Sequence, residues 1–244
     1  EIHKFMANRQ RSLQVDFLLN GIFKMLIFLR ILDPGSKKKT FERKDAYFEK
    51  FEFSLMDVYR SLTLFHKYKD ALLLHEEVRM KYGRDVSNVF YDVTNYYFEI
   101  EEPDGLRKKG VSKEHRPNPI VQMGLLMDRE GIPITYRLFS GNTNDCSTLL
   151  PVLSELKGSY NIDRMVVVAD RGLNTGENIA YNIIKGDGYI YSQSIRGAQK
   201  SLKSYVLNDQ GYVERENGFK IKSRIYPRET WVTNVDGQRV KAPI

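Results

Sequence analysis

Two aspartates stand where strands are expected, and their setting points most directly to chemistry. Asp92 lies inside the β-branched and aromatic stretch 88–100, NVFYDVTNYYFEI, although aspartate is disfavoured in strands. Asp170 ends the apolar run 165–169, MVVVA, and is followed directly by an arginine and a glycine. Ligands of open α/β sheets bind beyond the carboxyl ends of the strands, although an aspartate there can also simply cap a turn.

A pair of carboxylates at one edge of a sheet suits a magnesium or manganese site. Mg²⁺ takes one or two carboxylates from a protein and keeps phosphate oxygens and water in its shell. Two such ions, about 3.5–4 Å apart, can stabilise the entering and leaving oxygens of a displacement at phosphorus. If Asp92 and Asp170 lie on neighbouring strands, they predict a metal-dependent phosphodiester reaction.

The first third of the chain, residues 1–86, is predicted to be helical. The apolar stretch 17–32 carries polar residues at about one-turn intervals and is shorter than a bilayer requires, so we expect a buried helix rather than a membrane span. A break and the basic run 37–39 follow it. Two further helices are expected over 45–50 and 54–82.

From residue 87 the pattern changes to that of an α/β domain. The stretches 88–100, 120–128 and 132–139 predict three strands, and the tight turn between the last two favours an antiparallel meander. A polar and basic loop, 101–118, separates the first two strands.

Helices and strands alternate after the meander. Asn144 or Asp145 is expected to cap a helix, and the run 165–169 has the continuous apolar character of a buried parallel strand. A capping-box spacing at Asn174 predicts a second helix, and 188–192 a short fifth strand. The order β-β-β-α-β-α-β therefore predicts a mixed α/β sheet.

Three parts are expected along the chain: a helical region over 1–86, an α/β core over 87–194, and a basic, β-like segment over 195–244. The chain begins at Glu1 rather than at methionine and stops within that segment, so we expect a piece of a longer protein.

Composition favours a folded protein with a polyanionic partner. Hydrophobic residues make up 41% of the 244 residues, with 15 Tyr and 13 Phe, which argues against disorder. The net charge of +7 is modest but points to nucleic acid, with a generic basic surface as the alternative. The single Cys146 excludes an internal disulfide and a multi-cysteine metal site, which suits a reducing cytoplasm.

The loop 106–116, LRKKGVSKEHR, is the strongest candidate for contact with a DNA backbone. Basic side chains there would make salt-sensitive phosphate contacts without reading sequence, and an ordinary solvated loop is the alternative. Arg171 could hold a phosphate or pair with a neighbouring carboxylate. The candidate DNA contacts are Arg107, Lys108, Lys109, Lys113, His115, Arg116 and Arg171.

Three motifs in order resemble the catalytic core of insertion-sequence transposases of the IS4 type, in the IS1634-like branch with long β-insertions. They are FYDVTNYYFE, GVSKEHRPNPIVQMGLLMDREGIPITYRLFSGNTND and VVVADRGLNTGENI, and the resemblance covers roughly 54–194. It implies a ribonuclease-H-like fold with an acidic triad that holds two divalent ions, Mg²⁺ or Mn²⁺. Asp92 matches the first acid and Asp170 the second. The third is a glutamate on a later helix, after a β-rich insertion, and no segment here matches that helix.

The resemblance also implies the activity and the partners. It implies a DDE-type transposase that hydrolyses DNA at the ends of its element and transfers the freed strands into target DNA. DNA is then the partner, through the terminal repeats and the target site. A homodimer is implied in the DNA complex, within the cytoplasm at the nucleoid, and no membrane.

Other functions remain as alternatives. A non-catalytic DNA-binding or assembly remnant would keep the fold and the basic surface without turnover. A metal-dependent phosphohydrolase is a weaker alternative, because an aspartyl-phosphate enzyme needs a second acid two residues after the first, and Thr94 stands there. A nucleotide-binding dehydrogenase fits poorly, since RGLNTG lacks the Gly-x-Gly-x-x-Gly phosphate turn.

Overall fold

The computed structural model describes residues 2–13, 15–47, 49–69, 83, 85–111, 117–160, 162–225, 229–233 and 238–243. The chain divides into two compact units, Glu1–Arg84 and Asp85–Ile244, which we call the helical unit and the sheet unit. The helical unit contains α1 (Ile2–Ser12), α2 (Leu19–Leu32), α3 (Lys37–Glu42), the 3₁₀ helix η1 (Lys44–Ala46) and α4 (Leu55–Lys67).

The core of the helical unit forms around α2. Ile22, Met25 and Leu29 recur at helical spacing on this helix and are buried, as the apolar stripe of an amphipathic helix should be. Met6 of α1 and Val58 of α4 are buried in the same cluster. The expectation of a buried helix in this stretch is therefore confirmed.

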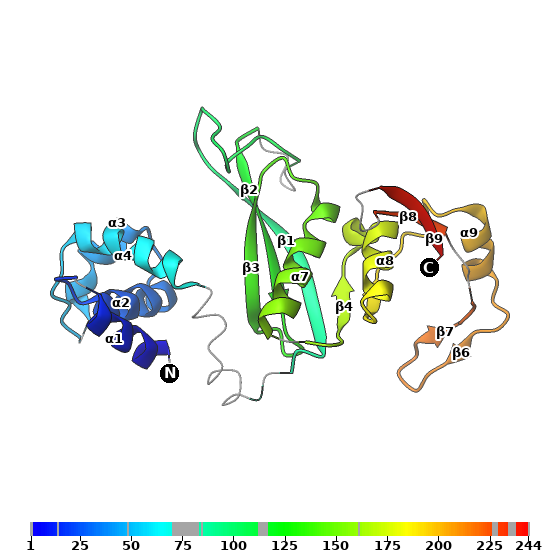
Figure 1. The fold of residues 1–244 in the computed structure, drawn as a ribbon, viewed down its shortest axis with the longest axis horizontal. Coiled ribbons are helices and arrows are strands. Elements are labelled where there is room, and N and C mark those ends of the chain that lie inside the picture. Colours follow the sequence, from blue (N-terminus) through cyan, green and yellow to red (C-terminus); the bar gives the residue numbers. More distant parts are fainter. Residues whose placement is uncertain are drawn as a thin grey trace. The chain divides into compact units, whose positions relative to one another are not determined.

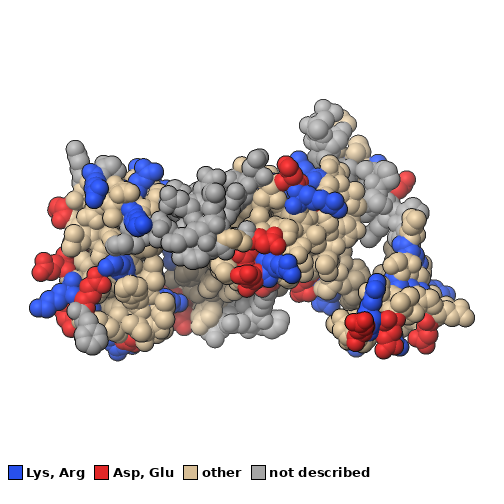
Figure 2. Space-filling model, turned by 90° about the horizontal axis from the view of Figure 1, so that it is seen from below, with Lys and Arg blue, Asp and Glu red and all other residues tan. Residues whose placement is uncertain are grey.

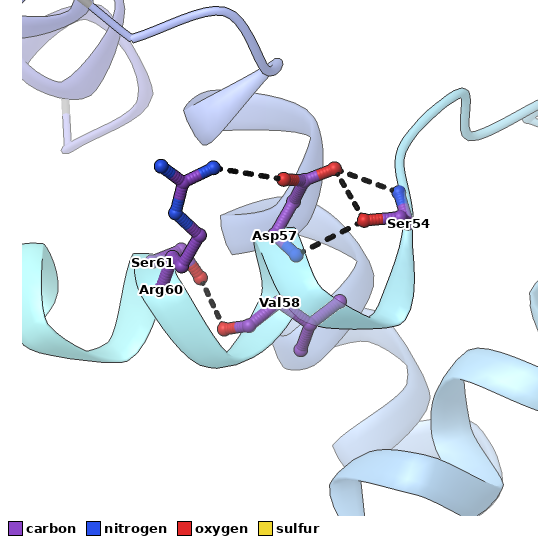
Figure 3. Close-up of polar contacts among 5 residues, drawn as sticks. All are labelled: Ser54, Asp57, Val58, Arg60 and Ser61. Carbon is purple, nitrogen blue, oxygen red and sulfur yellow. Dashed lines mark hydrogen bonds and ion pairs between the residues drawn. The ribbon is translucent and has the colours of Figure 1, made fainter.

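The start of α4 carries a reciprocal hydrogen-bond cap, drawn in Figure 3. Ser54 Oγ accepts the Asp57 N–H at 3.2 Å, and Asp57 Oδ2 accepts the Ser54 N–H at 2.9 Å. Hydrogen bonds from Ser54 hold the pKa of Asp57 below its ordinary value. Arg60 Nη1 lies 3.8 Å from Asp57 Oδ1 on the same face of the helix. One turn into the helix, the buried Ser61 hydroxyl donates to Val58 O at 2.7 Å. The cap fixes where α4 begins.

Several expectations for the helical unit were wrong in detail. The basic run 37–39, for which no helix was expected, forms the first turn of α3, because the Ser36 side chain accepts the Lys39 N–H and caps the helix. In place of a helix over 45–50, the described residues of this range contain the end of the short η1. The helix expected over 54–82 is described as α4, and residues 70–82 lie outside the described residues.

A five-stranded mixed sheet forms the centre of the sheet unit (Figure 1). Its order is β3-β2-β1-β4-β5, with β1 antiparallel to β2 and β2 to β3, and with β1, β4 and β5 parallel. The antiparallel meander and the parallel fourth strand are therefore confirmed. The strands are β1 (Asn88–Tyr97), β2 (Ile120–Met127), β3 (Pro133–Ser140), β4 (Val166–Ala169) and β5 (Gly188–Tyr191).

Helices connect the later strands of this sheet. After β3 come η2 (Asp145–Ser147) and α7 (Leu149–Tyr160), and after β4 come η3 (Arg171–Leu173) and α8 (Gly176–Ile184). The fold class is thus the expected α/β one, with the expected element order β-β-β-α-β-α-β.

Two capping expectations had different outcomes. Asn144 caps η2 as expected, with its side chain accepting the Cys146 N–H. Asn174 does not cap α8. Thr175 does so, by accepting the Asn178 N–H at 3.2 Å, since the chain is still turning through η3 at Asn174.

The two faces of the sheet differ. Along β1, Val89, Tyr91 and Val93 are buried, and the residues between them are exposed. Tyr91 Oη donates to Thr148 Oγ1 at 2.8 Å, just before α7, and Asn182 of α8 bonds the Tyr191 hydroxyl of β5 at 2.6 Å. We call this side the covered face and the opposite side, which carries residues 90, 92 and 94 of β1, the open face.

The open face includes apolar side chains that remain exposed. Phe90, Leu138 and Ile190 lie on it by register, and they are 38%, 45% and 61% exposed. Thr148, just before α7, and Asn182 of α8 both bond to the covered face, so these contacts lie on the side of the sheet opposite to the exposed apolar side chains.

The rest of the sheet unit is small and mostly β. Its elements are α9 (Lys200–Leu207), β6 (Val213–Glu214), β7 (Lys220–Ile221), β8 (Glu229–Thr233) and β9 (Arg239–Pro243). Lys222 Nζ, just after β7, donates to Tyr205 O and Asn208 O at 3.0 and 2.8 Å, which joins the β6–β7 hairpin to α9. Across the described part of the chain, every helix is too short or too polar to span a membrane.

Candidate functional site

The two aspartates lie in one row on the open face. The β1–β4 register pairs Asn88 with Val166 through Tyr91 with Ala169, so its next step aligns Asp92 with Asp170. Asp170 keeps an extended backbone, with φ −75° and ψ 169°, as this step requires. Aligned residues of parallel strands point to the same face, and neighbouring strands lie about 4.8 Å apart. Both aspartates are exposed. Continued by one step, the register therefore places the two aspartates side by side on one face of the sheet.

Asp170 also caps a turn, which was the alternative role expected for an aspartate at the end of a strand. Its Oδ1 accepts the Arg171 N–H at 2.6 Å at the start of η3. The same oxygen accepts a hydrogen bond from Ser192 Oγ at 2.9 Å. Capping a turn and lying beside Asp92 are compatible, because a carboxylate has two oxygens.

A hydrogen-bond network lies on the covered face, on the side of the sheet opposite to Asp92 and Asp170. Besides the Tyr91–Thr148 bond, Thr148 Oγ1 donates to Asp145 O at 2.7 Å, and Gln122 Nε2 donates to Asp145 Oδ1 at 3.0 Å. Burial raises the pKa of Tyr91 to about 12, so its hydroxyl remains a neutral donor. The network joins β1, β2 and the start of α7 directly behind Asp92.

Gly124 of β2 is what allows the Tyr91 ring to lie across the sheet. A Cβ on Gly124 would lie 2.1 Å from the Tyr91 hydroxyl oxygen, so no larger residue fits there without displacement. The sequence alone did not predict this contact. A glycine inside a strand indicates that another group approaches the backbone closely, but it does not identify that group.

A buried ion pair fixes the opposite end of β4. Lys157 Nζ of α7 lies 2.7 Å from Asp187 Oδ1, whose side chain is fully buried. The same oxygen accepts the Met165 N–H at 3.0 Å, and Lys157 also donates to Asp163 O at 3.1 Å. One carboxylate thereby joins α7, the residue before β4 and the turn before β5.

The donor set of the row fits a hard divalent cation but is small. Two exposed carboxylates are the number that Mg²⁺ commonly takes from a protein. Within the described ranges, no group of three or more His, Cys, Asp or Glu side chains could hold a metal ion. Asp92 and Asp170 are therefore the residues that could hold one here, with further ligands from substrate, water or another part of the protein.

The basic loop is fixed firmly at its base. Lys108 and Ile120 exchange backbone hydrogen bonds at 2.9 and 3.1 Å, and the Gly141 N–H donates to Leu106 O at 3.1 Å. A Cβ on Gly110 would lie 1.8 Å from Gly141 O, so the loop and the turn after β3 press backbone against backbone. The loop therefore leaves from a fixed point beyond the carboxyl end of β1, which continues from Asp92 to Tyr97.

The candidate DNA contacts in this loop differ in their surroundings. Arg107 is engaged by Asp104, at 2.6 Å, and this pairing holds the pKa of Asp104 at about 2. The side chains of Lys108 and Lys109 form no ion pair with any described residue, and Lys109 is exposed. Lysines 108 and 109 are thus better placed than Arg107 to contact phosphate.

The remaining candidate DNA contacts are Lys113, His115, Arg116 and Arg171. Lys113, His115 and Arg116 lie outside the described residues. Arg171 is exposed, and its side chain forms no ion pair with the described part of the chain. On the face drawn in Figure 2, Lys and Arg are interspersed with Asp and Glu, so the described residues there form no single large basic patch.

Comparison with known proteins gives a likeness of fold. No protein-family model and no curated protein matches the sequence. A solved Mos1 transposase paired-end complex with left transposon end is similar at TM-score 0.32 and 13% identity, over 76% of this chain and 69% of that chain. A piggyBac transposase synaptic complex with hairpin DNA is similar at TM-score 0.45 and 9% identity, over 91% and 50%. A mariner Mos1 paired end complex with Mg is similar at 0.29 and 13%, over 71% and 58%.

This chain spans 50% to 69% of the length of those three chains. At such low identities and TM-scores, these similarities say nothing about activity. Any inference about activity rests on the residues of this chain.

Proposed function

We propose that this chain is part of a DDE-type DNA transposase of an insertion sequence, of the IS4 type. The observation that carries the proposal is the alignment of Asp92 with Asp170 on the open face of neighbouring parallel strands. Three sequence motifs that resemble IS4-type transposases, in the same order along the chain, support it.

Asp92 and Asp170 hold divalent cations, Mg²⁺ or Mn²⁺, in this proposal. Two such ions, when bound, supply charge neutralisation at phosphorus and lower the pKa of water or a hydroxyl. The third acid is a glutamate that we take to lie outside these 244 residues, on a later helix. The exposed apolar side chains Phe90, Leu138 and Ile190 support this, because a helix that packs on the open face would bring a side chain near the acid pair.

The reaction has two phosphoryl transfers. Water attacks phosphorus at the end of the element, the bond from phosphorus to the 3′ oxygen breaks, and a 3′ hydroxyl is released. That hydroxyl then attacks a phosphodiester of target DNA, so one phosphorus–oxygen bond forms as another breaks. Positioning of the strands provides much of the acceleration in such reactions. A homodimer that pairs two element ends, at the nucleoid, is part of the proposal.

Lys108, Lys109 and Arg171 contact the DNA backbone in this proposal. Each neutralised phosphate releases counterions, so binding to any duplex should weaken as salt rises. Replacing Lys108 or Lys109 with alanine should reduce the slope of log affinity against log salt by about 1 each. The exposed Lys185, at the end of α8, provides a control that should leave the slope unchanged. Equal slopes for all variants would remove these lysines from the interface.

Metal binding is the direct test. The chain is titrated with Mn²⁺, and free Mn²⁺ is measured by electron paramagnetic resonance. Asp92→Asn and Asp170→Asn should each abolish or strongly weaken binding, and Asp209→Asn, at an exposed acid elsewhere in the sheet unit, should not. Binding that survives in both site variants would contradict the metal site.

DNA cleavage by the full-length parent protein tests the activity itself. Asp92→Ala and Asp170→Ala should each lose end cleavage and retain DNA binding. Cleavage at the normal rate by either variant would overturn the assignment.

One observation favours a second candidate, a non-catalytic DNA-binding or assembly remnant. Asp170 is engaged in capping η3, which a folded remnant would also need. Such a protein would bind duplex DNA with a salt-dependent affinity but would not bind Mn²⁺ through the acid pair. The titration described above separates the two candidates.

A further inference from the structure

Ser192 extends the row of the acid pair to a third strand. The β4–β5 register pairs Val166 with Gly188 through Ala169 with Tyr191, so its next step aligns Asp170 with Ser192. Ser192 follows β5 directly, and its hydroxyl reaches across to Asp170 Oδ1 at 2.9 Å. Asp92, Asp170 and Ser192 thus occupy equivalent positions on three adjacent parallel strands.

Two donors from different elements meet on one oxygen of Asp170. The Arg171 N–H comes from η3, and the Ser192 hydroxyl comes from the end of β5. The terminal torsion of an aspartate side chain is intrinsically broad, so a carboxylate without such bonds samples many orientations. Two donors on Oδ1 restrict that rotation and thereby fix the direction of Oδ2.

Asn174 holds the serine in place. Its Nδ2 donates to Ser192 O at 3.0 Å and to Gln193 Oε1 at 2.7 Å. The Asn174 N–H donates to Arg171 O at 3.1 Å, which closes η3. The turn that follows Asp170 is therefore joined by hydrogen bonds to the segment that carries Ser192.

We propose that Ser192 is a positioning residue for the metal site: its hydroxyl orients the Asp170 carboxylate for a divalent ion and does not itself contact the ion. This inference rests on the proposed function, since it takes Asp170 as a metal ligand. Residues that hydrogen-bond metal ligands typically change metal affinity about 10- to 100-fold when they are replaced, because they pre-organise the ligand.

The test compares four variants of the full chain, with Mn²⁺ alone as the probe. They are Ser192→Ala, which removes the hydroxyl; Ser192→Thr, which keeps it; Ser194→Ala, a matched serine two residues further on; and Asp170→Asn. Binding is measured by electron paramagnetic resonance and by paramagnetic broadening of the Asp170 and Arg171 amide signals in nuclear magnetic resonance spectra, which detects weak binding. The thermal unfolding midpoint of each metal-free variant is recorded alongside.

Ser192→Ala should weaken Mn²⁺ binding about 10- to 100-fold. Ser192→Thr should restore most of that loss, Ser194→Ala should bind like the original chain, and the unfolding midpoints should agree. Rescue by threonine distinguishes positioning from a general structural defect, since both Ser192 variants change the side chain at the same site.

The outcomes separate this inference from the proposed function. If Ser192→Ala binds Mn²⁺ as tightly as the original chain while Asp170→Asn does not bind, the positioning role is overturned and the metal site stands. A threonine variant as weak as the alanine one would also overturn it. If the original chain binds no Mn²⁺, or Asp170→Asn binds normally, the metal site fails and the inference fails with it.

Discussion

The covered and open faces of the same strands follow different rules. On the covered face, Tyr91 is buried, hydrogen-bonded and pressed against Gly124. One residue further on, Asp92 is exposed on a face that also carries exposed apolar side chains. Stability is concentrated on one side of the sheet, and the groups that could do chemistry are on the other. Substitutions on the covered face should therefore change folding, whereas those on the open face should change binding.

The largest effect on the covered side is expected at the buried ion pair. Lys157→Met leaves the buried carboxylate of Asp187 without its partner, and breaking a buried pair from one side costs about 3–5 kcal/mol. Urea unfolding measures this, with Lys185→Met as the control at an exposed lysine. A loss below about 1 kcal/mol would mean that solvent reaches this pair.

Two leucines provide a matched pair across the sheet. Leu126 of β2 is fully buried on the covered face, and Leu138 of β3 is 45% exposed on the open face. Leu126→Ala should lower the free energy of unfolding by about 2–5 kcal/mol, since it leaves a cavity. Leu138→Ala should cost far less, because surface changes usually stay within about 0.5 kcal/mol. Similar losses for both would show that something covers the open face in the isolated chain.

Gly124→Ala should cost about 1–3 kcal/mol, the usual range for overpacking, because its Cβ would meet the Tyr91 hydroxyl. Gly172→Ala is the control: a Cβ there meets nothing within 4 Å, although this glycine stands next to the acid pair. Differential scanning calorimetry measures the loss of stability in each of the two variants. Equal destabilisation by both would contradict the packing of Tyr91 over Gly124.

The smallest effect expected on this face comes from Tyr91→Phe, which removes one buried hydrogen bond and should cost about 1 kcal/mol. Tyr96→Phe on the open face should be neutral, because the contact of its hydroxyl with the Met123 sulfur, at 4.0 Å, is long and exposed.

The cost of Tyr91→Phe should also depend on pH. The folded pKa of Tyr91, about 12, lies above its unfolded value, so the folded state prefers the neutral hydroxyl. That preference is fully present below pH ~10 and is lost as the pH rises toward 12. The stability gap between the two proteins should therefore shrink over this range in urea titrations at several pH values. A constant gap would contradict the burial of the hydroxyl.

Sequence periodicity predicted most of the sheet. The β-branched and aromatic residues around Asp92 indicated β1, and the uninterrupted apolar run before Asp170 indicated a parallel strand. Both signals are local, because they reflect which faces of a strand are buried. The alignment of Asp92 with Asp170 needed one further assumption, that β1 and β4 are neighbours, and the strand order supplies it.

The supporting residues could not be predicted in the same way. Ser192 and Asn174 matter through contacts with residues of another turn, and neither lies in a pattern that differs from ordinary loop sequence. Gly124 makes sense only once Tyr91 is known to lie across it. The helix at Lys37 was missed because three lysines resemble a solvated connection, although Ser36 before them is a good cap.

The alternation along β1 has a consequence for how this chain can vary. Which side of the sheet a residue occupies depends on whether it is an odd or an even number of steps from Tyr91. A single codon inserted between Asn88 and Asp92 would exchange the two sides for part of the strand, driving a carboxylate into the interior and an aromatic ring into water. Length changes that preserve this parity are therefore the only ones the strand should tolerate, whereas the loops at its ends are under no such constraint.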